Sequence, residues 1–123
     1  MSLSCEWLIA NYNICLAHAH IILIERVKKQ GVVDHASILA QIAVYYNKAH
    51  EMYCMNPNLM AVDQGSACNG LKYRALHIWA EAYENTAQLK SDLRLKCANL
   101  NCAYQILQSA REFTSDPADI CYI

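Results

Sequence analysis

Apolar side chains recur at intervals of three and four residues along most of this chain of 123 residues. That spacing places them on one face of an α-helix, since the helix turns once in 3.6 residues. The pattern is clearest over residues 35–55, in one continuous stripe: Ile38, Ile42, Tyr45, Ala49 and Met52. No β-alternation of useful length is present, and only 3 Gly and 2 Pro interrupt the chain. The sequence therefore predicts an all-α fold, an antiparallel helical bundle.

The first expected helix begins after a cap at Ser4, reaches Lys28 and Lys29, and ends at Gly31. Its apolar residues cover several faces: Trp7, Leu8, Ile14, Leu16, Ile21, Leu23 and Ile24. A helix that is apolar nearly all round is usually packed on more than one side. We therefore expect this helix to be the central element of the bundle.

Two more helices are expected before residue 90. Asp34 can cap the second helix, over 35–55, and "NPN" at 56–58 ends it. Residues 59–70 are the most loop-like part of the chain. A third helix is expected over 71–89. Four of its apolar residues share one face: Leu71, Ala75, Ile78 and Ala82.

A fourth helix is expected over 92–113, with Ser91 as a weak cap. Its apolar stripe consists of Leu93, Cys97, Leu100, Tyr104 and Leu107. Because neither Gly nor Pro separates this segment from the preceding one, a single long helix is an alternative. We expect one helical domain over 1–123, with 1–58 and 69–123 as candidate sub-modules.

The last residues have the features of a helix start. Asp116 suits the N-cap and Pro117 the first helical position, yet only about one turn follows. Cys121 has two residues after it, whereas prenylation requires three. We therefore expect a cut through a longer chain rather than a lipid anchor.

Charge and hydropathy restrict the surroundings of the chain. Its 10 basic and 11 acidic residues leave no basic excess, so we expect no nucleic-acid partner. Uninterrupted apolar runs such as "IILI" at 21–24 are too short to span a bilayer, and the N-terminus lacks the basic region of a secretory signal. We expect a cytoplasmic protein. Peripheral membrane association and homo-oligomerisation stay open.

Seven cysteines are enough for a disulfide framework, but the number is odd and four of them lie in apolar helical segments. Those four are Cys15, Cys54, Cys97 and Cys102. Small secreted proteins usually place paired cysteines in loops. We expect reduced thiols that are mostly buried and behave as small apolar side chains.

The sequence predicts no metal and no cofactor. His18 and His20 are two residues apart on a helix, so they point in different directions and cannot share an ion. His50 and Cys54 are four apart and can share one, but zinc needs two more ligands and no CxxC or HExxH motif supplies them. We therefore expect surface histidines.

No catalytic residues are predicted either. The chain has no GxSxG motif, no glycine-rich phosphate loop and no kinase signature. Arg74 and His77 lie three apart, closer than the Arg and His pair of small helical ribonucleases. Glu81 and Glu84 lie on a solvated face. We therefore expect a non-enzymatic chain, and a small helical nuclease is the least favoured reading.

Aromatic residues are the remaining candidates for function. Tyr46 and Tyr53 follow members of the second helix's stripe, while Trp79 and Tyr83 flank the stripe of the third. Core packing is the simpler interpretation. Alternatively, these four side chains line a groove that binds a partner's amphipathic helix, a contact in which aromatic residues are favoured.

The order of the segments resembles a known region. "EWLIANYNICLAHAHIILIERVKKQG" followed by "HASILAQIAVYYNKAHEMY" resembles the opening of the C-terminal early-autophagy-targeting region of the autophagy-initiating serine/threonine kinases. "LKYRALHIWAEAYENTAQL" is similar to its middle helix, and "AYQILQSAREFTSDPADI" to the helix and capped turn before its last helix. The resemblance covers most of the chain, although the stretch between Tyr53 and Leu71 is shorter and the final helix is missing.

The resemblance implies a non-catalytic kinase tail made of two packed three-helix microtubule-interacting-and-transport modules. In that family the region binds short helical motifs of the HORMA-domain autophagy adaptor and acts where autophagosomes form. The missing last helix puts the groove of the second module in doubt. An unrelated helical adaptor or a self-associating bundle is the alternative.

Overall fold

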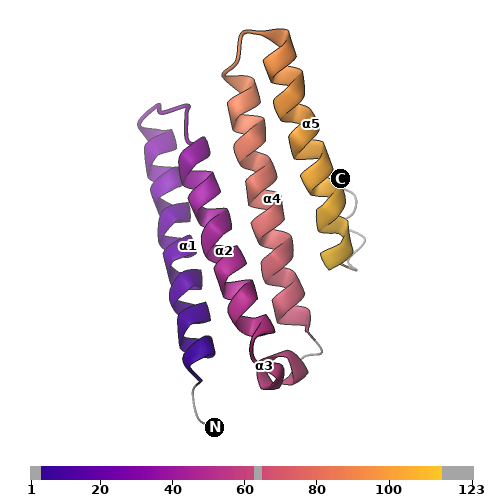
Figure 1. Cartoon of the computed structure of the whole chain (residues 1–123). Coiled ribbons are helices and arrows are strands. Elements are labelled where there is room, and N and C mark those ends of the chain that lie inside the picture. The colour runs from indigo at the N-terminus through magenta and orange to yellow at the C-terminus, as the bar shows by residue number, and fades with distance from the viewer. Residues whose placement is uncertain (1–3, 63–64, 115–123) are drawn as a thin grey trace.

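The computed structural model describes residues 4–62 and 65–114 (Figure 1). Within them it contains no strand, so the all-α prediction is confirmed. The described helices are α1 (Cys5–Lys29), α2 (Ala36–Cys54), α3 (Pro57–Val62), α4 (Ser66–Gln88), α5 (Leu93–Ala110) and a 3₁₀ turn, η1 (Arg111–Phe113). The predicted helix start at Asp116 and Pro117, and Cys121 beyond it, lie outside the described residues.

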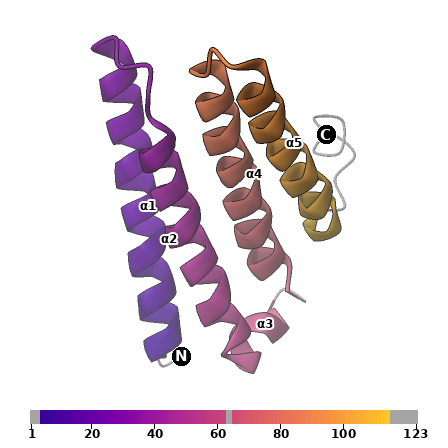
Figure 2. The same cartoon turned by 45° about the horizontal axis from the view of Figure 1, so that its top comes forward.

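The four long helices lie side by side in one row, in the order α1, α2, α4 and α5, and neighbours run antiparallel (Figure 1). The turned view in Figure 2 shows the same order. The short α3 lies at the end of the row where the chain passes from α2 to α4. Since the main contacts join row neighbours, α1 and α5 each pack mainly on one long helix.

The expectation that the first helix is central is therefore wrong. α1 forms an edge of the row, and it buries only Ala10, Asn13, Ala17 and Ile24. Its all-round apolar character arises because a second apolar face, which includes Leu8, Tyr12 and Ile22, is exposed. Apolar residues on several faces mean that α1 is able to pack on both sides, but they do not show that both sides are packed.

The apolar run at 21–24 also belongs to a longer apolar element. α1 has 25 residues and, among the described helices, it is the one long and apolar enough to cross a membrane by length and composition. Only 17% of its most apolar stretch is buried, in contrast to a core helix of a soluble protein. Polar residues, among them Asn11, His18 and Glu25, interrupt it.

The ends of α1 have clear local causes. The Ser4 side chain accepts a hydrogen bond of 3.0 Å from the backbone N–H of Trp7, which caps the first turn. At the other end Gly31 adopts φ +83°, and the N–H of Val32 reaches back to the carbonyl of Val27 at 3.0 Å. This left-handed glycine turn ends the helix as the sequence predicted.

The start of α2 depends on a distant residue. Its N-cap is His35 rather than Asp34, and the His35 side chain makes no capping hydrogen bond. Instead Asn85 of α4, which is buried, accepts from the His35 N–H at 3.1 Å and donates to the Val33 carbonyl at 3.0 Å. A side chain 50 residues away thus satisfies the backbone at the connection between α1 and α2.

The segment expected to be a loop, residues 59–70, is largely helical. Asn56 accepts hydrogen bonds from the backbone N–H groups of Asn58 and Leu59, which begins α3. Gly65, with φ +81°, then allows α4 to begin at Ser66, five residues earlier than expected. The alternative of one long C-terminal helix is excluded, because Asp92 caps a separate α5 by accepting from the N–H of Arg94 at 2.8 Å.

The core is built largely from alanine. Ten of its residues are alanines: Ala10, Ala17, Ala43, Ala49, Ala75, Ala80, Ala82, Ala87, Ala103 and Ala110. The largest fully buried side chains are Tyr46, Ile42 and Cys68. The predicted stripe of α2 is confirmed, since Ile42, Ala49 and Met52 are buried. Small contact residues let neighbouring helices approach closely, so the row buries few large side chains.

The predicted stripe of the last helix faces the wrong way. Leu93, Leu100 and Tyr104 are 71%, 46% and 57% exposed, whereas Ala103 and Ala110 are buried. The apolar spacing correctly indicated one face of a helix. It failed to indicate which face packs, because α4 accepts the narrow alanine face of α5.

The cysteines are mostly exposed, contrary to expectation. Among those described, only Cys68 is buried, while Cys5, Cys15, Cys54, Cys97 and Cys102 are exposed. No disulfide joins two of these cysteines. The expectation failed because an open row leaves much of each helix surface uncovered, so a helical apolar position need not be a core position.

Candidate functional site: a groove between helices α2 and α4

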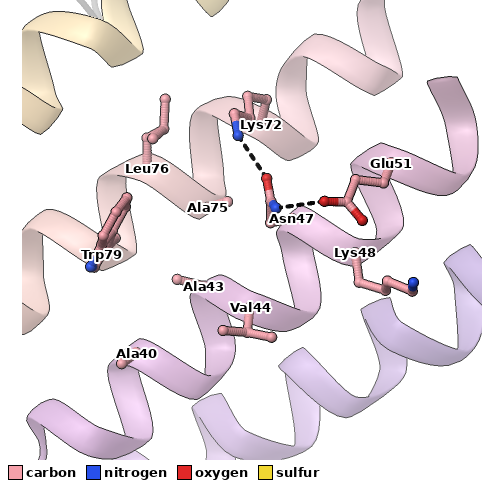
Figure 3. A pocket seen from close by; sticks show the side chains of 10 residues that line it. All are labelled: Ala40, Ala43, Val44, Asn47, Lys48, Glu51, Lys72, Ala75, Leu76 and Trp79. Atoms are coloured by element: carbon pink, nitrogen blue, oxygen red, sulfur yellow. Dashed lines mark hydrogen bonds between the residues drawn. The ribbon is translucent and has the colours of Figure 1, made fainter.

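A groove of about 410 Å³ lies on one face of the row between α2 and α4 (Figure 3). Ten residues line it: Ala40, Ala43, Val44, Asn47, Lys48 and Glu51 from α2, and Lys72, Ala75, Leu76 and Trp79 from α4. The α2 residues recur at intervals of three and four beside the buried stripe of that helix. The groove therefore follows the seam where the two helices pack.

The floor and walls of the groove are apolar. Ala43 and Ala75 are buried at its base, where their small side chains leave room between the two backbones. Val44 on one side and Trp79 on the other are 58% and 45% exposed. In Figure 3 Ala43 lies on the side of α2 that faces α4, and Val44 lies farther from α4, on the side of α2 where Lys48 also lies. A small base between exposed apolar walls fits an apolar side chain from another molecule.

One end of the groove is polar. The Lys72 ammonium donates to Asn47 Oδ1 at 2.7 Å, and Asn47 Nδ2 donates to Glu51 Oε1 at 3.2 Å. The first bond crosses from α4 to α2 and the second lies within α2, and Figure 3 shows both as dashed lines. Lys48 points away from α4 and makes no ion pair with the part of the chain described.

The four predicted partner-binding residues are not brought together. Trp79 is a wall of the groove, as the groove hypothesis required. Tyr83 is half-buried and does not line the groove, although its ring centroid lies 6.2 Å from that of Trp79. Tyr53 is half-buried and packs on the cluster of Ala10, Ala49 and Met52, on the α1 side.

Tyr46 is a core residue, so its assignment to a groove wall is corrected. It is 1% exposed. The His18 ring of α1 meets it edge-on at 6.3 Å, and the Arg74 guanidinium of α4 lies 5.9 Å from its centroid. Tyr46 therefore sits where α1 and α4 both flank α2, a position that spacing along one helix cannot reveal.

Sequence reasoning missed the other groove residues. Val44, Leu76 and Lys72 lie outside the aromatic pattern that drew attention to these helices. A usable signal was present in α2, where Ala40 and Ala43 precede an exposed valine. Small residues at the contact between two helices, beside a large exposed one, are consistent with a shallow groove.

The residues considered for catalysis lie in two different places along α4. Arg74 lies over Tyr46, while His77 Nδ1 lies 3.5 Å from Glu81 Oε1, one turn along α4. Glu81 is exposed, and it lines, together with His77 and Glu84, a second hollow of about 380 Å³ that reaches Leu107 of α5. The Arg74–His77 pair is thus divided between two different environments.

The structure does gather possible metal ligands. His50 and Cys54 lie in the last turns of α2, and the buried Cys68 of α4 joins them, so that their ligand atoms lie within 4.8 Å of one another. The sequence argument against a metal counted only the first two. The third ligand comes from the segment that was expected to be a loop.

Comparison of the chain with protein-family models, with curated proteins and with solved structures gave no match.

Proposed function

We propose that this chain is a non-catalytic protein-interaction domain that binds a short amphipathic helix of a partner protein in the groove between α2 and α4. The observation that carries the proposal is the exposed pair Val44 and Trp79 above an alanine base. A partner helix would insert apolar side chains at i, i+3 or i+4, and i+7 between these walls. Trp is among the residue types that are enriched at the anchoring positions of such contacts.

The charged rim restricts the partner's chemistry. Lys72 is hydrogen-bonded to Asn47, and Asn47 is hydrogen-bonded to Glu51. The polar groups at this end of the groove therefore already have partners within the chain. Lys48 has its ammonium directed outward at the side of α2. An acidic residue on the flank of the partner helix would pair with it, which favours correct orientation more than affinity.

The resemblance to the autophagy-kinase region suggests a particular partner. On that reading the partner is the HORMA-domain adaptor, and the chain acts in the cytoplasm where autophagosomes form. Helix order and the quoted segments support it. The division into two three-helix modules, 1–58 and 69–123, stays a prediction of the same reading. An unrelated helical adaptor would use the same groove with a different partner.

A designed amphipathic peptide can test the groove. The probe is a helix with leucines on one face and glutamates on its flanks, and its binding is measured by titration calorimetry. Replacing Trp79 or Val44 by alanine should weaken binding by about 1–3 kcal/mol, or about 5- to 150-fold. Melting should change little, because about half of each side chain is exposed.

Leu100→Ala is the matched control, since Leu100 of α5 is 46% exposed and lies outside the groove. This variant should bind the peptide as the parent does. A second peptide with lysines in place of the flanking glutamates should bind more weakly. Equal weakening by Trp79→Ala and Leu100→Ala would show that the peptide binds apolar surface in general and would reject the groove.

A further inference from the structure

Three side chains with metal-binding atoms meet where α2 ends and α4 begins. Cys54 Sγ lies 3.1 Å from Cys68 Sγ and 3.6 Å from His50 Nε2. Cys68 Sγ lies 3.1 Å from His50 Nδ1. His50 and Cys54 share one face of α2 because they are four residues apart. Cys68 reaches them from the first turn of α4.

A backbone hydrogen bond prepares the imidazole for a metal ion. His50 Nδ1 lies 2.9 Å from the Cys68 carbonyl oxygen. A carbonyl can only accept, so in this hydrogen bond Nδ1 carries the proton and Nε2 keeps its lone pair. Metal-bound histidines usually donate their other ring N–H in this way, which fixes the ring orientation. Nε2 is the nitrogen that lies near Cys54.

The distance between the two sulfurs and that from Cys54 Sγ to His50 Nε2 are close to those of a zinc site, whereas Cys68 Sγ lies 3.1 Å from Nδ1 and shares an ion with Nε2 only after its side chain rotates. With Zn–S bonds of about 2.3 Å at tetrahedral angles, two bound sulfurs lie about 3.8 Å apart. The two sulfurs here would separate by less than about 1 Å, a movement that small side-chain rotations provide. Two thiolates and an imidazole suit zinc, whereas magnesium and calcium prefer oxygen ligands.

We propose that His50, Cys54 and Cys68 form a zinc-binding site, with a fourth ligand supplied by water or by another molecule. Two thiolates and a neutral imidazole balance the two positive charges of the ion. Zinc would link α2 to α4 through two cysteines that are 14 positions apart in the chain, with α3 between them. Three protein ligands with one open position are typical of a site that exchanges its fourth ligand.

The site lies at one end of the proposed groove. His50 is followed by the groove residue Glu51, and Lys72 stands one turn along α4 from Cys68. Zinc would thus hold α2 and α4 together beside the polar end of the groove. This inference does not depend on the groove's being a binding site.

Metal uptake by the full chain tests the proposal. The protein is stripped with a chelator in a phosphine reductant and then titrated with Zn²⁺. We expect about one zinc per chain by elemental analysis and a higher melting temperature. Co²⁺ in its place should give the near-ultraviolet thiolate charge-transfer band and the visible bands of a tetrahedral ion. Zinc should also slow alkylation of Cys54 while leaving that of the exposed Cys97 unchanged.

Cys54→Ala and His50→Gln should abolish stoichiometric uptake, and Cys97→Ala and Cys15→Ala should retain it. Cys54 is exposed, so its replacement should leave the fold intact. Cys68 is buried, and Cys54→Ala therefore keeps the test valid even if Cys68→Ala unfolds the protein. Three results would overturn the site: no uptake by the reduced chain, uptake that persists in Cys54→Ala, or a Cys54–Cys68 disulfide formed in place of metal binding.

Discussion

At the scale of single residues, side-chain size separates the core from the surface more clearly than polarity does. Large apolar residues such as Leu93, Tyr12 and Val33 are 65% exposed or more, while alanines occupy most buried positions. Few large side chains therefore contribute most of the free energy that apolar burial supplies to folding. Ile42 and Tyr46 are the clearest cases, at 0% and 1% exposure. Substitutions at these two positions should matter far more than those at the exposed large apolar residues.

Ile42→Ala should lower the free energy of unfolding by about 2–5 kcal/mol, because it opens a cavity in the cluster that also contains Tyr46 and Ala17. Val44→Ala, two residues away on the same helix, is the control. Val44 is 58% exposed, so its truncation should change stability by less than about 0.5 kcal/mol. Urea denaturation of both variants provides the measurement. Equal losses would contradict the packing described for α2.

At the scale of helices, glycine determines two of the helix ends: the end of α1 and the start of α4. Gly31 and Gly65 have positive φ, and each lies where the chain turns between elements. The third glycine, Gly70, is inside α4 and has no neighbouring atom within 4 Å of an added Cβ. The same chemical change should therefore have opposite effects at Gly31 and Gly70.

Gly31→Ala should destabilise the protein by about 1–2 kcal/mol, since an L-residue is strained in the left-handed region although space for its Cβ is open. Gly70→Ala should stabilise it by about 0.5–1 kcal/mol through the higher helix propensity of alanine. Thermal unfolding of the two variants beside the parent gives the sign of each change. Two changes of the same sign would refute this account of the helix ends.

At the scale of the molecule, the row has two apolar edges. The outer face of α1 presents an exposed stripe at intervals of three and four residues: Cys5, Leu8, Tyr12, Cys15, Ala19 and Ile22. α5 presents Leu93, Leu100 and Tyr104 at the other edge. Contiguous apolar surface of this kind is uncommon on monomeric soluble proteins and indicates contact with another surface. The α1 stripe is the longer of the two and has the spacing of a coiled-coil seam.

We expect the isolated chain to self-associate through α1. Sedimentation velocity should show a mass that rises with protein concentration, and Tyr12→Lys combined with Ile22→Lys should keep the chain monomeric. Gln41→Lys, at an exposed position of α2, is the control and should not change the association. Flotation of the parent chain with lipid vesicles, and not of the double variant, would instead assign the stripe to a membrane surface.

The sequence by itself determined the four long helices and most of their ends, though not α3 or the start of α4, because helix formation depends on local spacing, caps and glycines. Ser4, Gly31 and the α2 stripe through Ile42 behaved as predicted. Of the predicted partner-binding residues only Trp79 lines the groove. A groove forms between two helices, and the pattern along one helix does not show which residues of the other lie opposite. Tyr46 is aromatic like Trp79 and lies on the same helix as Val44, but it is a core residue.

The tertiary structure alone decided which apolar face of each helix packs, which helix lies at the edge, and which distant residues meet. α1 and α5 each carry two faces that could be buried, and only the neighbouring helix selects one. Asn85 joins His35, and Cys68 joins His50, across 50 and 18 residues, distances over which periodicity holds no information. Packing is a property of pairs of surfaces, and a single helical pattern specifies only one member of each pair.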